Sequence, residues 1–282
     1  MAAASSDQRV GFVLGGGGLH GAAEVGMLAA LDEAGIEPDL LVGTSVGAIN
    51  GALIAAHPAG SGVTRLTGLW ESLGTVEVFS GSAIGRLVTL ARTRTHLHSQ
   101  DALEAVLERN LPPTFEDLRL PFQCVAASVE RATARWFGKG DLVPAILASC
   151  AVPGLFPPVE IDGEHHMDGG LVHSIPVGRA IDLGATEVFV LHVGRIETPL
   201  TKPRHAVDVA FASFEIARRH RFFEEIERFK ESAAIHVLPA AAEGLGFNDL
   251  TQFRYRDARR IATSIEQARA ATARYLAEIG RG

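Results

Sequence analysis

The sequence predicts an α/β fold, with a mostly parallel central sheet and helices on both of its faces. Short apolar runs alternate with helix-period patterns along most of the chain, and the first run ends in four consecutive glycines before a helix begins. The 282 residues are 47% hydrophobic and 21% charged, which is enough apolar material for a sizeable core. We therefore expect a single α/β domain over residues 9–282, preceded by a flexible N-terminus at 1–8.

The first four predicted elements set the direction of the sheet. Arg9–Leu14 is rich in β-favouring residues and is predicted to be a buried strand. Ala22–Gly35 follows as a helix, with apolar residues at three-residue spacing and a glycine to end it. Asp39–Gly43 is predicted to be the second strand and Ala48–Ala56 the second helix. Strand–helix units in this order build a parallel sheet.

Further strands and two long helices are expected later in the chain. The strands are predicted at residues 123–129, 134–137, 187–193 and 234–238, and the helices at 205–232 and 256–279. Asp162-Gly163 is typical of the turn of a small hairpin between Val159 and Met167.

Residues 58–120 interrupt the alternation of strands and helices. They contain helical patches at 63–73, 84–92 and 101–111 without a clear strand among them. We expect them to form a helical insertion or a cap, and residues 200–282 to form a helical C-terminal part.

Composition excludes several classes of protein and site. A net charge of −7 and a pI near 5.9 argue against nucleic-acid binding, which needs a basic excess. Cys124 and Cys150 are too few and too far apart for a disulfide framework or a Cys-based zinc site. The first ten residues lack the pattern of a signal peptide, and the longest apolar run, 41–56, is broken by polar residues and too short to cross a bilayer. The expected location is cytoplasmic, with peripheral membrane contact as an open possibility.

The first motif is the glycine-rich turn Gly15–Gly21. Bare backbone at a strand-to-helix junction directs several N–H groups at one point, which suits a phosphate or a developing oxyanion. Residues 16–21 also fit the GxGxxG pattern of dinucleotide-binding folds. That fold requires an acidic residue where the second strand ends, whereas Asp39 stands where it begins. The dinucleotide interpretation therefore lacks its supporting residue.

The second motif, Gly43-Thr44-Ser45-Val46-Gly47, has the GxSxG pattern between a strand and a helix. A sharp turn there lifts a serine hydroxyl clear of the sheet, and the glycines permit close passage of neighbouring backbone. The alternative is a plain loop in which Ser45 caps the helix. The flanking strand and helix favour a nucleophile elbow after the second strand.

The third motif, Met167-Asp168-Gly169-Gly170, follows the predicted hairpin. A serine hydroxyl needs an adjacent base, and Asp168 could supply it, although Asp before two glycines is also common in ordinary turns. His173 could instead be the base of a serine triad, with Asp168 orienting it.

Taken together and in this order, the three motifs resemble those of the patatin-like phospholipase family. Residues 148–158 and 175–185 look similar to the family's segments before and after its DGG motif. The resemblance implies a Ser–Asp dyad without a catalytic histidine, with Ser45 as nucleophile and Asp168 as proton acceptor. It also implies an acyl ester of a lipid as substrate, and neither a cofactor nor a metal.

The same resemblance assigns roles to the glycines of the three motifs. Backbone N–H groups of Gly16, Gly17 and Gly18 would form the oxyanion hole. The remaining glycines belong to the motifs themselves: Gly21, Gly43, Gly47, Gly169 and Gly170. The family usually has Arg, sometimes Lys, at the position of His20, so a permanent cation is replaced by a group charged only at lower pH. His20 is expected either to donate a hydrogen bond beside the oxyanion hole or to face solvent.

Other interpretations remain open from the sequence. One is a Ser-His-Asp α/β-hydrolase; another is a non-catalytic regulatory protein that holds an anion or lipid at its glycine turn. Residues 164–168 contain potential metal ligands, with His166 and Asp168 on one side of a strand, but we expect solvated hairpin residues because no third ligand is evident. The phenylalanines of helix 205–232 are expected to pack mostly into the core, with membrane docking by this helix and its basic residues 218–221 as the alternative.

Overall fold

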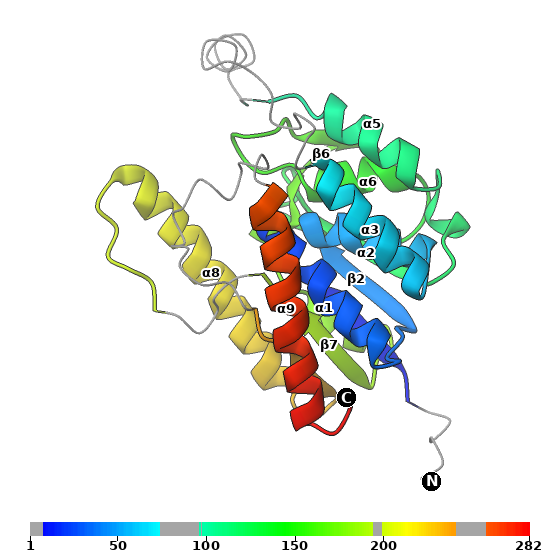
Figure 1. The fold of residues 1–282 in the computed structure, drawn as a ribbon. Coiled ribbons are helices and arrows are strands. Elements are labelled where there is room, and N and C mark those ends of the chain that lie inside the picture. The colour runs from blue at the N-terminus through cyan, green and yellow to red at the C-terminus, as the bar shows by residue number, and fades with distance from the viewer. Residues whose placement is uncertain (1–7, 74–95, 97, 194–198, 241–257) are drawn as a thin grey trace.

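The computed structural model describes residues 8–73, 96, 98–193, 199–240 and 258–282 (Figure 1). Its strands are β1 (Val10–Leu14), β2 (Leu40–Thr44), β3 (Phe122–Ser128), β4 (Thr133–Phe137), β5 (Val159–Ile161), β6 (Glu164–Asp168), β7 (Glu187–Leu191) and β8 (Ala234–Val237). Its α-helices are α1 (Ala22–Glu33), α2 (Val46–Ala56), α3 (Gly60–Leu73), α5 (Asp101–Asn110), α6 (Leu142–Ser149), α7 (Val177–Asp182), α8 (Ala206–Phe229) and α9 (Ala258–Glu278). Short 3₁₀ turns are η1 (Gly18–Gly21), η2 (Phe115–Asp117) and η3 (Gly169–Leu171).

The described strands form one eight-stranded sheet in the order β5-β6-β3-β2-β1-β7-β8, with β4 paired to β3. The pairs β1–β2, β1–β7, β2–β3 and β7–β8 are parallel, whereas β6 and β4 run antiparallel to β3. Leu14, the last residue of β1, is level with Gly43 of β2 and Leu191 of β7. The turns that follow β1 and β2 therefore emerge side by side at the carboxyl end of the parallel strands.

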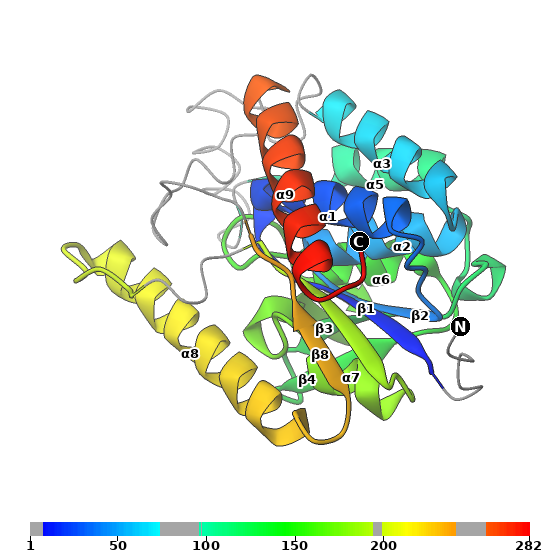
Figure 2. The same cartoon turned by 60° about the horizontal axis from the view of Figure 1, so that its bottom comes forward.

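Alternate residues of the central strands fill two separate cores. Phe12, Leu14 and Leu41 pack with the helices α1, α2 and α9 on one face. Val13 and Val42 pack on the other face with buried residues of α7 and α8. Figure 2 shows the same layers, with α1, α2 and α9 on one side of the strands and α7 and α8 on the other. The predicted α/β class, with helices on both faces of a mostly parallel sheet, is confirmed.

The predicted strands and helices are found with ends shifted by one or a few residues. The hairpin turn is also present, with φ of +54° at Asp162 and +77° at Gly163. Helices α6 and α7 were not predicted from the sequence. In α6, Pro144 occupies the first turn, where its missing N–H leaves no helical hydrogen bond unmade. The predicted helical patch at 84–92 and the N-terminal residues 1–7 lie outside the described residues.

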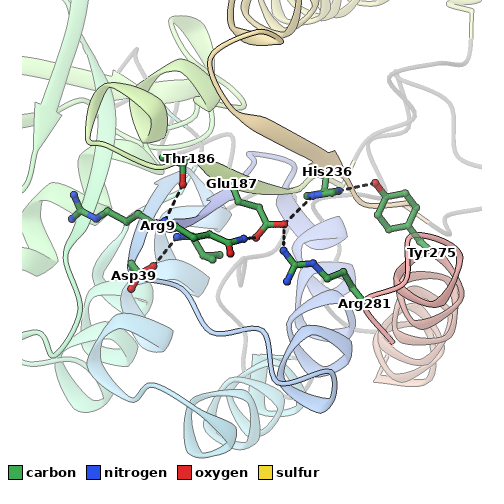
Figure 3. Close-up of polar contacts among 9 residues, drawn as sticks. Arg9, Asp39, Thr186, Glu187, His236, Tyr275 and Arg281 are labelled. Carbon is green, nitrogen blue, oxygen red and sulfur yellow. Dashed lines mark hydrogen bonds and ion pairs between the residues drawn. The ribbon is translucent and has the colours of Figure 1, made fainter. Parts of the chain in front are cut away.

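At the amino end of the parallel strands, a polar cluster joins residues near both ends of the described chain to the sheet (Figure 3). Glu187, the first residue of β7, is 4% exposed and accepts hydrogen bonds from Gln8 at 2.6 Å and Arg281 at 2.5 Å. His236 Nε2 lies 3.2 Å from the same carboxylate. Beside it, Val10 N–H donates to Asp39 Oδ2 over 2.7 Å. The Asp39 side chain thus contacts the start of β1 just before β2 begins.

Candidate active site

Ser45 occupies a strained turn between β2 and α2, with φ of +54° and ψ of −124°. A residue other than glycine pays on the order of 1–3 kcal/mol for this backbone conformation. The contacts around Ser45 must therefore hold the turn in place. The N–H of Ser45 donates to Ser149 Oγ over 2.9 Å, and its carbonyl accepts from Ala48 N at 2.8 Å. Thr44 Oγ1 anchors the preceding residue by donating to the carbonyl of His173 over 2.7 Å.

The glycines on either side of Ser45 are required by close backbone contacts. A Cβ on Gly43 would lie 2.4 Å from the carbonyl oxygen of Gly47, and one on Gly47 would lie 2.4 Å from that of Leu14. Neither separation is possible for a real Cβ. The nucleophile elbow predicted after the second strand therefore has the geometry that its glycines indicated.

Asp168 ends β6, which β3 pairs with antiparallel through Ala126. Its Oδ2 accepts the Ser45 hydroxyl over 2.7 Å, and its Oδ1 accepts the N–H of Gly170 over 2.7 Å. Burial raises the pKa of Asp168 from its ordinary 3.8 to about 6, against the opposing hydrogen bonds from Ser45 and Gly170. Among the described residues, no cationic side chain contacts this carboxyl.

The glycine-rich turn passes directly beside Ser45. A Cβ on Gly16 would lie 3.3 Å from Ser45 Cβ. Gly15 N–H donates to Leu191 O over 2.9 Å and Gly16 N–H to Ser174 O over 3.0 Å, while the N–H groups of Gly17 and Gly18 have no acceptor within the described parts of the chain. The expectation that Gly16 offers its N–H to an oxyanion is therefore corrected, because that N–H is already bonded.

The other predicted motif residues surround this turn and Asp168. A Cβ on Gly21 would lie 2.4 Å from Val46 Cγ2, and one on Gly169 would lie 2.1 Å from Val125 O. Gly170 bonds to Asp168 through its N–H, as described above. His20 lies within η1, and its side chain is partly exposed.

His173 is turned away from Ser45. Its Nδ1 lies 2.9 Å from Glu225 Oε1, its Nε2 lies 3.3 Å from Arg221 Nη1, and its ring packs against Trp136 at 5.1 Å between centroids. Both ring nitrogens are thus engaged by other side chains. The structure does not bring His173 to the serine, as a triad with Asp168 as orienter would require.

The hairpin residues that suggested a metal site divide into two environments. His165 is exposed and lies 2.7 Å from Glu130, as expected of a solvated residue. His166 is fully buried against Phe137, which corrects the expectation that it is solvated. Within the described residues there is no group of three or more side chains able to hold a metal.

Two site residues, Ser149 and Thr44, were not assigned a role from the sequence. Ser149 lies within the segment 148–158 that resembles the family, but its bond to Ser45 spans 104 positions. Thr44 was recognised only as the variable position of GxSxG, and its partner is 129 positions away. No local pattern marks either contact.

Comparison with known proteins gives the family of this chain. The model of the family described as patatin-like phospholipase matches residues 12–181. The chain belongs to this family. The match spans the glycine-rich turn, Ser45 and Asp168, so the resemblance seen in the three motifs is confirmed.

Sequence relatives of this patatin-like chain are much longer proteins. It is 33% identical over 193 residues to lysophospholipase nte1 of Aspergillus terreus, which covers 67% of this chain and 12% of the relative. It is 31% identical over 196 residues to the protein of the same name in Neurospora crassa, with the same two coverages. The chain thus spans about an eighth of the length of these relatives.

Similar solved structures include VipD from Legionella pneumophila and ExoU bound to SpcU from Pseudomonas aeruginosa. The first has a TM-score of 0.48 and 13% identity, over 96% of this chain and 67% of VipD. The second has a TM-score of 0.43 and 15% identity, over 96% of this chain and 52% of the matched one.

Of the helices that the structure describes in the present chain, none has the length and apolarity to cross a membrane.

Proposed function

We propose that this patatin-like chain is a serine acyl-ester hydrolase that acts on lipids through a Ser45–Asp168 dyad. The observation that carries the proposal is the direct hydrogen bond of 2.7 Å between the Ser45 hydroxyl and Asp168, at a strained turn beside unpaired backbone donors. The relatives named lysophospholipase support the lipid as substrate class.

In the first half of the reaction, Asp168 removes the proton of Ser45 Oγ as that oxygen attacks the ester carbonyl. The carbonyl oxygen becomes negative and accepts hydrogen bonds from the N–H groups of Gly17 and Gly18. The C–O bond to the alcohol then breaks, and the departing oxygen takes the proton from Asp168. The acyl group remains on Ser45 as an ester.

In the second half, a water molecule gives its proton to Asp168 and attacks the acyl carbonyl through the same oxyanion. The bond to Ser45 Oγ breaks, Ser45 regains its proton from Asp168, and the fatty acid leaves. A base with a pKa of about 6 is mostly ionised at neutral pH and still has appreciable proton affinity. The scheme uses no metal and no cofactor.

Exposed apolar side chains on α8 support peripheral contact with a lipid surface. Val209, Ile216 and Phe223 follow one another at seven-residue spacing on α8 and are 52%, 58% and 50% exposed. Phe214 on the same helix, 38% exposed, packs on Gly170 beside Asp168, where a Cβ would lie 3.3 Å from its ring. The expectation that most phenylalanines of this helix face the core holds for Phe222, which is 5% exposed, and for half-buried Phe229, which packs on Gly178, but not for Phe214. The side chain of Phe211 is not among those described.

This surface makes a separate prediction about substrate presentation. Ile216→Glu should lower hydrolysis of lysophospholipid in vesicles by about tenfold, because it removes apolar area and adds a charge where lipid would lie. Hydrolysis of a water-soluble short-chain ester should stay within about twofold. Equal loss on both substrates would contradict the contact.

The dyad itself is tested by a fluorophosphonate probe with peptide mass mapping, on the parent chain, Ser45→Ala and Asp168→Asn. We expect an adduct on Ser45 in the parent and none in either variant, together with release of fatty acid from lysophosphatidylcholine by the parent only. A folded parent that gives no adduct would overturn the hydrolase proposal and favour a non-catalytic role for the glycine turn.

A further inference from the structure

Behind the glycine-rich turn lies a buried polar cluster that takes no part in the proposed chemistry. It consists of Glu24 on α1, Asn50 on α2 and Trp70 on α3, and each of these side chains is at most 1% exposed. Asn50 Nδ2 donates to Glu24 Oε2 over 2.7 Å, and Trp70 Nε1 donates to Asn50 Oδ1 over 3.0 Å. We call these three residues the Glu24 cluster.

The Glu24 cluster joins the two helices that follow the two turns of the site. Glu24 lies in the first turn of α1, just after the glycine-rich turn, and Asn50 lies in α2, which starts directly after Ser45. Asn50 Nδ2 also donates to the carbonyl of Gly21, the last residue of the glycine-rich turn, over 3.1 Å. The amide of Asn50 on α2 therefore contacts both the glycine-rich turn, at Gly21, and helix α1, at Glu24.

Burying a carboxyl group at the position of Glu24 costs folding free energy. Burial raises the pKa of Glu24 well above its usual range, against the opposing hydrogen bond from Asn50. Its Oε1 is buried without a hydrogen-bond partner among the described residues. An apolar side chain of similar size would avoid both costs, so stability alone gives no reason for an acid here.

We propose that Glu24 is a positioning residue, which through Asn50 holds the glycine-rich turn in register with Ser45. The inference rests on the proposed hydrolase function. The donors that matter are the N–H groups of Gly17 and Gly18, which must face the oxygen that becomes negative after Ser45 attacks. Displacement of these donors by about 1 Å can lower the rate on the order of 100-fold. Hydrogen bonds that hold α1 and α2 together should therefore raise kcat.

Three variants separate positioning from ordinary stability. Glu24→Leu keeps the volume but cannot accept from Asn50, whereas Glu24→Gln keeps the acceptor. Val25→Ala, at the adjacent buried position of α1, removes apolar contacts without touching the cluster. We expect Glu24→Leu to lower kcat for lysophosphatidylcholine by about 30–100-fold with KM within about threefold. Glu24→Gln should restore kcat to within about threefold, and Val25→Ala should lower the melting temperature but keep kcat.

A second readout does not depend on activity. Amide hydrogen exchange of Gly15 and Gly16, whose N–H groups bond to Leu191 and Ser174, reports directly on the turn. Exchange should accelerate in Glu24→Leu and stay at the parent rate in Glu24→Gln and Val25→Ala. If Glu24→Leu does not fold, Trp70→Phe removes one donor from the cluster at nearly constant volume and should lower kcat by about three- to tenfold.

The outcomes distinguish this inference from the proposed function. Unchanged exchange at Gly15 and Gly16 in Glu24→Leu, or an equal loss of kcat in Glu24→Leu and Val25→Ala, would overturn the positioning role. A parent chain without hydrolysis or probe adduct would overturn the hydrolase proposal, and the exchange rates would still show whether Glu24 holds the turn.

Discussion

The two ends of the parallel strands each hold a buried carboxylate, in opposite surroundings. Glu187, at the amino end, is 4% exposed and bonds to Arg281, with His236 beside it (Figure 3). Asp168, at the carboxyl end, is 6% exposed and, within the described parts of the chain, accepts hydrogen bonds from only the Ser45 hydroxyl and the Gly170 N–H. The ion pair with the Arg281 guanidinium makes Glu187 a structural tie between the C-terminal residues and β7. A carboxylate without such a cation keeps enough proton affinity to exchange a proton with its neighbour.

The same contrast extends to the backbone. At the carboxyl end, Ser45 is held at φ +54° and Gly17 and Gly18 leave their N–H groups unpaired among the described residues. At the amino end, Arg9 N–H donates to Thr186 Oγ1 over 2.9 Å and Val10 N–H to Asp39. One end of the sheet thus satisfies its polar groups, and the other retains strain and unpaired donors where chemistry is proposed.

The largest expected effect comes from Asp168→Asn. Loss of the base should lower kcat by about 10³-fold, within the range for general acid–base groups. The same variant should be more stable at pH 7, because raising the pKa from 3.8 to about 6 means that ionising buried Asp168 costs about 3 kcal/mol of folding free energy. Since this cost is absent below pH 4 and grows as pH rises toward 6, the variant's gain in melting temperature should vanish at pH 4. A variant that is less stable than the parent at pH 7 would contradict the account.

A smaller effect is expected from pH in the parent chain. Asp168 must be ionised to accept a proton, so kcat/KM should fall about tenfold per pH unit below its pKa of about 6. Initial rates with a soluble ester between pH 4.5 and 8 measure this limb. A midpoint near pH 4 in the fall of kcat/KM would mean that burial does not raise the pKa of the catalytic base, Asp168.

At the amino end we expect a loss of stability without a loss of rate. Glu187→Ala should lower the free energy of unfolding by about 1–3 kcal/mol, since Arg281 and His236 lose their shared partner and Arg281 is only partly buried. Chemical denaturation measures the loss, and kcat at 25 °C should stay within about twofold. A fall in kcat as large as that of Asp168→Asn would break the contrast between the two ends.

The smallest expected effect is that of His173→Ala. Its ring bonds to Glu225 and Arg221 and not to Ser45, so kcat should remain within about threefold of the parent. Steady-state hydrolysis of a soluble ester is sufficient to measure it. A loss of about 10³-fold or more would instead support the Ser-His-Asp triad.

Most of the fold and the identity of the motif residues could be predicted from the sequence alone. Short apolar runs placed the strands and helical patterns placed the long helices, because each signal depends on residues within one element. The glycines of the GxSxG motif indicated close backbone passage, and Cβ distances of 2.4 Å at Gly43 and Gly47 bear this out. Asp39, which the sequence places where the second strand begins, accepts the N–H of Val10 at the start of the first strand.

Only the tertiary structure decided which of these groups meet. Ser45 and Asp168 are separated by 123 positions, and their contact depends on β6 pairing antiparallel with β3. The bond that occupies Gly16, the burial of His166 and the turn of His173 toward α8 likewise involve distant partners. Local sequence fixes the backbone conformation of a turn or a strand, whereas hydrogen bonding and pKa depend on what other parts of the chain bring against it.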